Sequence, residues 1–120
     1  MEKKPLVIHH CDPESNYANR VAYRPETTGE NYYIEFKKGG CYAYKAVPES
    51  HFTNLAVCQQ TKAALAAGEP INWTFASKPG SEGSYLIMYV VGSKTNRPYE
   101  YRPMDAVEAA EIFPYEPTKP

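Results

Sequence analysis

The sequence predicts an α+β fold with a mainly antiparallel sheet of about six strands and two helices on one of its faces. Several short segments alternate apolar and polar residues at the period of a strand, and two longer segments repeat apolar residues at helical spacing. An aromatic run, a glycine-bearing turn and a Tyr-x-Tyr pair also occur twice, within 32–44 and 85–101. Two such copies predict an internal duplication, with ββ(β)α units related by a pseudo-twofold axis.

The first half of the chain predicts four strands. Residues 5–11 contain a short apolar run that suits an edge strand, and residues 20–24 alternate as a second strand. Residues 32–37 alternate most clearly and predict the third. Gly39-Gly40 predicts a tight hairpin turn, because glycine readily adopts the positive φ that such turns require. Residues 41–47 then return as the partner strand.

A helix is predicted to follow Pro48, since proline suits the first turn of a helix. Its apolar and small residues recur at spacings of three, four and seven, which gives one face toward a core: Phe52, Leu55, Ala56, Ala63 and Ala66. Gly68 followed by Pro70 predicts the end of this helix.

The second half predicts a looser copy of the same order. Residues 71–75 are strand-like, and residues 85–91 form an apolar run that predicts a strand covered on both faces. Residues 92–97 predict a turn. Residues 98–102 predict the returning strand, since proline is tolerated at a strand start.

A short final helix is predicted after Asp105, because Glu108 three residues later completes a capping box. Pro114 ends it, and residues 114–120 are expected to be a mobile tail. We therefore expect one domain over 1–120, with a first unit over 19–68 and a second, degenerate unit over 71–113.

Composition limits the classes of function. The chain has 120 residues, a formal net charge of −1 and a pI near 6.3, which argues against a general polyanion-binding protein. No apolar run approaches the length of a membrane span, so no membrane partner is expected. Three scattered cysteines without a CxxC pair, and no signal peptide, predict a cytoplasmic protein.

The stretch 33–44, followed by Val47-Pro48 and a helix, resembles the KTSC domain. This module of roughly 60 residues occurs at the C-terminus of some lysyl-tRNA synthetases and alone in small bacterial and phage proteins. The resemblance covers about residues 19–60. It is looser in the second unit, where Met104-Asp105 replaces Val-Pro. The synthetase context implies a role in RNA binding.

Paired tyrosines and nearby basic residues form the candidate binding site. Aromatic side chains on a sheet can stack on bases, while lysine and arginine contact phosphates. The tyrosines expected to stack are Tyr42, Tyr44, Tyr99 and Tyr101, and the phosphate contacts are expected from Lys37, Lys38, Lys45, Lys94, Arg97 and Arg102. The alternative is that this tyrosine face is the core beneath the helices.

The sequence does not predict an enzyme, a metal site or a cofactor. His9-His10 with Cys11 offers metal-ligand types, but adjacent strand residues point in opposite directions and rarely converge on one ion. His51 beside Glu49 and Ser50 has residue types that suit acid–base chemistry, but an ordinary place at the start of a helix is favoured.

We expect a small non-catalytic binding module for RNA, single-stranded nucleic acid or a nucleotide-like anion. The near-neutral charge favours a small nucleotide over a long nucleic acid. A protein-interaction module, such as a phage-type inhibitor of a bacterial protein, is about equally favoured, because tyrosine is enriched at interfaces. The apolar run 85–91 also suits a homodimer contact, and a structural accessory domain without a ligand is the third alternative.

Overall fold

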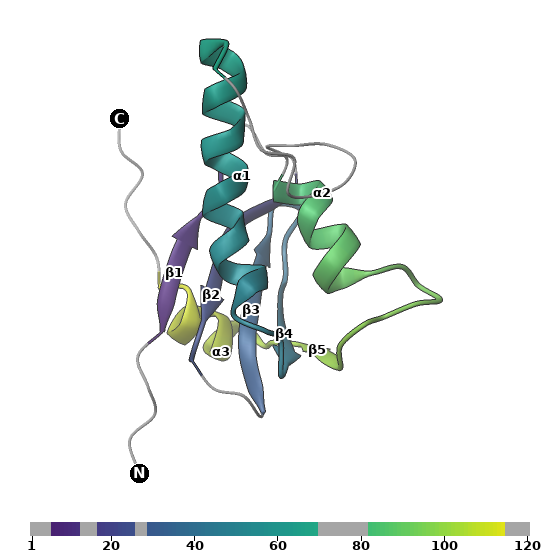
Figure 1. Ribbon diagram of the computed structural model, residues 1–120. Helices are drawn as coiled ribbons and strands as arrows, with labels where there is room; N and C mark the ends of the chain where they lie inside the picture. Colours follow the sequence, from purple (N-terminus) through teal and green to yellow (C-terminus); the bar gives the residue numbers. More distant parts are fainter. Residues whose placement is uncertain (1–5, 13–16, 26–28, 70–81, 115–120) are drawn as a thin grey trace.

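A computed structural model describes residues 6–12, 17–25, 29–69 and 82–114. Figure 1 shows one sheet with helices packed against it. In chain order the elements are β1 (Val7–His10), β2 (Ala18–Tyr23), β3 (Glu30–Phe36), β4 (Cys41–Lys45), α1 (Ser50–Ala67), α2 (Glu82–Leu86), the π-helical turn η1 (Ile87–Val91), β5 (Tyr101–Pro103) and α3 (Ala106–Ile112). The strands pair antiparallel in the order β1-β2-β3-β4-β5, so β1 and β5 form the two edges. The predicted α+β class is confirmed.

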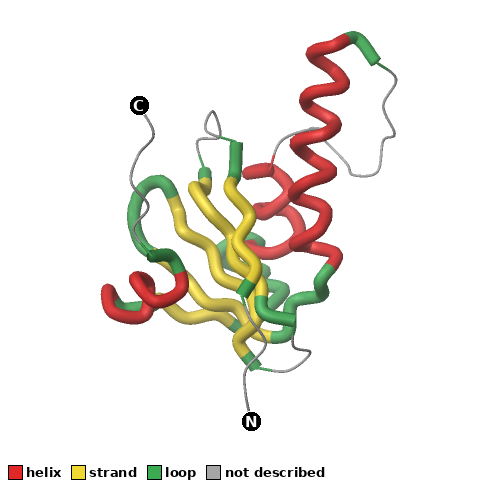
Figure 2. The backbone as a smooth tube through the Cα atoms, turned by 90° about the vertical axis from the view of Figure 1, so that its left-hand side faces the viewer, coloured by secondary structure: helices red, strands yellow, loops and turns green. Residues whose placement is uncertain are grey.

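Each face of the sheet is covered by different helices, which corrects the prediction that two helices pack on one face (Figure 2). On one face Tyr32 and Ile34 of β3 join a core with Leu55 of α1 and Leu86 of α2. On the other face Tyr33 joins a smaller core against α3. Consecutive residues of β3 therefore enter different cores, as the alternation of strand side chains requires.

Three local signals for turns and helix ends are confirmed, whereas Pro48 lies before α1 and not in its first turn. Gly39 and Gly40 join β3 to β4 with φ of 101° and 84°, values that favour glycine. Gly68 ends α1 in the left-handed conformation, and its backbone N–H donates to the carbonyl oxygens of Ala64 and Leu65. Asp105 caps α3 in a complete capping box with Glu108.

The prediction of a strand over 85–91 is wrong, because these residues form the end of α2 and all of η1. A short apolar run fits a buried strand or a buried helical segment equally well by pattern alone. In the helical conformation Leu86 and Val90, four residues apart, share the buried side and Ile87 is left exposed.

The described residues contain five strands and three α-helices, and so do not confirm the predicted number of about six strands and two helices. They do not confirm the internal duplication either, since 85–91 is helical where its counterpart 32–36 is a strand. The predicted strand 71–75 lies outside the described residues, as does the predicted tail except for Pro114.

No helix among the described residues is both long enough and apolar enough to span a lipid bilayer.

Candidate functional site

A groove of about 780 Å³ lies along the edge strand β5. It gathers five of the ten residues that the sequence analysis assigned to binding. Its lining consists of Glu30, Lys45, Arg97, Pro98, Tyr99, Glu100, Tyr101 and Arg102. The strands β3, β4 and β5 and the segment before β5 supply these side chains, so the groove is formed only when β5 pairs with β4.

The four predicted tyrosines fall into different environments. The β4–β5 register places Tyr44 opposite Tyr101, with 5.9 Å between the stacked ring centroids. Tyr44 is 2% exposed and Tyr101 is 44% exposed. Tyr42 is half-buried against Phe36 and lies outside the groove lining. The core alternative therefore holds for Tyr44, whose burial raises its pKa, whereas Tyr99 and Tyr101 line the groove.

Arg97 is placed over the exposed ring of Tyr101, at 5.0 Å from the guanidinium carbon to the ring centroid. It also donates a hydrogen bond to the Val91 carbonyl oxygen at 3.0 Å. The turn that carries it depends on Gly92, which has φ of 73° and whose missing Cβ would lie 2.1 Å from the Asn96 carbonyl oxygen. No ion pair of Arg97 with a carboxylate occurs among the described residues, so its charge faces the groove beside an aromatic ring.

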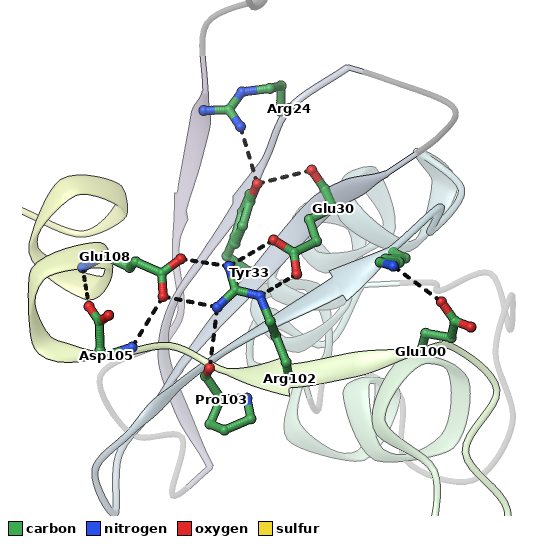
Figure 3. A network of polar contacts seen from close by, with 9 residues as sticks. Arg24, Glu30, Tyr33, Glu100, Arg102, Pro103, Asp105 and Glu108 are labelled. Carbon is green, nitrogen blue, oxygen red and sulfur yellow. Dashed lines mark hydrogen bonds and ion pairs between the residues drawn. The ribbon is translucent and has the colours of Figure 1, made fainter.

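Arg102 is fully engaged by protein groups (Figure 3). Its Nη2 donates to Glu30 at 2.9 Å and to Glu108 at 2.6 Å, while Nε and Nη1 complete bidentate contacts with the same two carboxylates. Hydrogen bonding to Glu108 and then to Glu30 raises the pKa of Arg102, and the bond from Arg102 lowers the pKa of Glu108. A phosphate at Arg102 would have to displace one of these carboxylates.

The predicted lysines do not converge on the groove. Lys45 lines it and pairs with Glu100 at 3.5 Å, a pair that is weak because both side chains are largely exposed. Lys37, Lys38 and Lys94 are exposed and are not among its lining residues. Lys38 lies instead at a smaller pocket of about 390 Å³ beside Tyr17 and Tyr42.

Tyr99 connects the groove to an aromatic cluster around His51. Its ring lies 6.1 Å from His51, whose ring stacks on Tyr89 at 5.8 Å. The Tyr85 hydroxyl accepts from Asn54 at 2.9 Å and lies 2.9 Å from His51 Nδ1. The single hydroxyl proton can be donated to Nδ1 only when that nitrogen is unprotonated. Burial also lowers the pKa of His51.

We expect the stability of the fold to decrease as the pH falls below about 6.5, the usual histidine pKa. Below that pH His51 is protonated in the unfolded chain but stays neutral in the folded chain, whose His51 pKa is lower. Because the unfolded state then binds more protons, lowering the pH favours unfolding. Replacing His51 by glutamine is expected to remove part of this dependence, as measured by urea unfolding from pH 5 to 8. The exposed His10→Gln serves as the control, and an unchanged dependence in His51→Gln would contradict the assignment.

A group of chemically reactive side chains that the sequence analysis did not assign lies at the opposite edge of the sheet. Glu82, with a side chain 1% exposed, contacts His9 Nε2 and accepts from the Asp12 backbone N–H at 2.7 Å. The Cys11 thiol is close by, and burial, followed by the charge of Glu82, raises its pKa to about 12. His9 and Cys11 are two residues apart on an extended chain and share one side, a signal available in the sequence; Glu82 comes from 73 residues away.

Comparison with protein-family models, with curated protein sequences and with solved structures finds no match to this chain. The resemblance to the KTSC domain therefore stays a prediction.

Proposed function

We propose that the protein is a non-catalytic binding module whose β5 groove takes a small anionic ligand with a planar ring, of the nucleotide class. Arg97 over the exposed Tyr101 ring is the observation that carries this proposal. Tyr99 and Tyr101 offer aromatic surface to a base, and Arg97 offers a positive charge to a phosphate.

The charges around the groove favour a single nucleotide over a long nucleic acid. Arg102 and Lys45 both face carboxylates, and the whole chain has a formal net charge of −1. A polynucleotide needs many phosphate contacts along an extended cationic surface. In the groove, Arg97 bonds a backbone carbonyl oxygen and not a carboxylate, which suits a ligand with one phosphate group or a short chain of them.

Titration of the full chain with ATP, followed by calorimetry and by amide chemical shifts, is expected to detect binding at the groove. Arg97→Gln is expected to weaken it about 10- to 150-fold, because hydrogen bonds to a charged group contribute about 1.5–3 kcal/mol. Tyr101→Ala is expected to weaken it about 5- to 150-fold through the loss of base stacking. Lys94→Gln is the matched control, since Lys94 lies on the same turn but outside the groove lining.

Absence of ATP binding, or equal loss in Arg97→Gln and Lys94→Gln, would contradict the proposal. A 12-nucleotide single-stranded RNA titrated in parallel tests the preference for a small ligand. We expect the RNA to bind no more tightly than ATP.

A protein-interaction module is the second candidate, favoured by two neighbouring apolar side chains on η1. Ile87 and Met88 are 46% and 47% exposed, although large apolar residues are usually buried. Their exposure suits contact with a partner protein or a second copy of the chain. Sedimentation of the same samples separates the candidates, because a homodimer changes the mass with concentration whether or not ATP is present.

A further inference from the structure

Three potential metal ligands converge at the β1 edge, across the sheet from the β5 groove. The groups are a ring nitrogen of His9, Sγ of Cys11 and a carboxylate oxygen of Glu82, and these atoms lie within 4.8 Å of one another. His9 is on β1, Cys11 directly follows that strand, and Glu82 is the first residue of α2. The site therefore joins the start of the described chain to its second half and is independent of the proposed nucleotide groove.

Backbone and side-chain contacts hold Cys11 and Glu82 in place. The Cys11 N–H donates to the Asn19 carbonyl oxygen at 2.9 Å, which keeps the chain extended beyond β1 and leaves Cys11 on the same side as His9. One carboxylate oxygen of Glu82 accepts from Asp12 N–H at 2.7 Å, and the other accepts from Gln59 Nε2 at 3.1 Å. Such contacts orient a ligand before the metal arrives, which raises affinity.

We propose that His9, Cys11 and Glu82 bind one zinc ion. Imidazole nitrogen, thiolate sulfur and carboxylate oxygen are the three ligand types that zinc takes in proteins, whereas calcium and magnesium require oxygen ligands. Zinc bond lengths place tetrahedral ligand atoms about 3.3–3.8 Å apart. The present separations thus need only small side-chain rotations, with His9 and Glu82 moving apart to admit the ion. As zinc binds, the thiol proton of Cys11 passes to solvent. The proton between His9 Nε2 and the Glu82 carboxylate also passes to solvent, so that Nε2 offers its lone pair to the metal while Nδ1 carries the ring proton.

The surroundings of the cluster suit a cation better than an ordinary ion pair. The Glu82 side chain is 1% exposed, and a buried carboxylate is costly unless positive charge or hydrogen bonds compensate it. The Cys11 thiol converges on this carboxylate and on His9, so the three groups together offer oxygen, sulfur and nitrogen ligands to one cation. A pocket of about 370 Å³ lies beside the cluster and is lined in part by Cys11 and Gln59. A zinc ion with three protein ligands has a fourth coordination position, and a water molecule can fill it from the side of this pocket.

The test is titration of chelator-treated full-length protein with zinc chloride by calorimetry and with cobalt(II) chloride by absorption. We expect one ion per chain, a thiolate-to-cobalt charge-transfer band and a higher melting temperature with zinc, because an ion that binds the folded state stabilises it. Loss of a group that merely orients a ligand lowers affinity 10- to 100-fold, so Cys11→Ser and Glu82→Gln are expected to weaken zinc binding by at least about 100-fold.

Cys41→Ala is the matched control, since Cys41 is buried in the core on the other face of the sheet. Zinc binding by this variant is expected to be unchanged. No zinc binding by the wild-type protein, a cobalt spectrum without the thiolate band, or equal weakening in Cys41→Ala would overturn the proposal. If Cys11→Ser fails to fold, the cobalt spectra of the wild-type protein, Cys41→Ala and Cys58→Ala decide the question, because a thiolate band that persists in both variants leaves Cys11 as the ligand.

Discussion

Replacing Tyr44 by alanine is expected to lower the free energy of unfolding by about 3–5 kcal/mol, the usual loss for a large buried aromatic side chain. Tyr44 is 2% exposed, and its ring packs at 5.9 Å from Tyr101 and 6.5 Å from Tyr32. Removing it leaves a cavity between β4 and the layer that contains α1 and α2. The measurement is the midpoint and slope of a urea unfolding curve, with the slope expected to stay unchanged.

Tyr101→Ala is the matched control for that substitution. The two tyrosines are paired across β4 and β5, but Tyr101 is 44% exposed. Its removal is expected to cost about 0.5–1.5 kcal/mol, the value of an aromatic pair, and to act mainly on ligand binding. Equal losses of stability at the two positions would contradict the assignment of Tyr44 to the core and Tyr101 to the groove.

Replacing Asn31 by alanine is expected to lower the free energy of unfolding by about 2–5 kcal/mol, because the buried N–H and carbonyl oxygen of Val47 lose their partner. Asn31 is fully buried at the start of β3. Its Nδ2 donates to the Val47 carbonyl oxygen, and its Oδ1 accepts from the Val47 N–H, each at 3.0 Å. The pair fixes the chain where it leaves β4 and turns toward α1, directly after Ala46 with its φ of 51°.

The exposed Asn19→Ala on β2 is the control and is expected to change stability by less than about 0.5 kcal/mol. Asn31→Asp distinguishes the contributions of the two hydrogen bonds to stability. Its carboxylate keeps an acceptor for the Val47 N–H but offers no donor to the Val47 carbonyl until it is protonated. Part of the lost stability is therefore expected to return at acidic pH. An Asn31→Ala loss no larger than that of Asn19→Ala would show that the bonds to Val47 do not stabilise the fold.

The candidate site was predictable in composition but not in arrangement. Lys45, Arg97 and the tyrosines Tyr99 and Tyr101 were expected from aromatic and basic residues on neighbouring strands, and the structure brings them to one groove. The pairing of Arg102 with Glu30, 72 residues away, could not be seen in the sequence, because no pattern relates charges on β5 to charges on β3.

The cluster at the β1 edge shows the same limit. The spacing of His9 and Cys11 places them on one side of an extended chain, and this could be read from the sequence. The third member, Glu82, is brought to the cluster by the packing of α2 against α1. The residues next to Glu82 in the sequence form no pattern that predicts a metal ligand.

By itself, the sequence determined the features that depend on neighbouring residues. These are the alternation in β3, the glycine turn into β4, the end of α1 at Gly68 and the cap of α3 at Asp105, each set by backbone preferences within a few residues. Only the tertiary structure decided that 85–91 is helical and that the helices cover both faces of the sheet. A short apolar run can be buried either as a strand or as a helical segment. Its conformation therefore depends on the residues that pack against it and not on its own pattern.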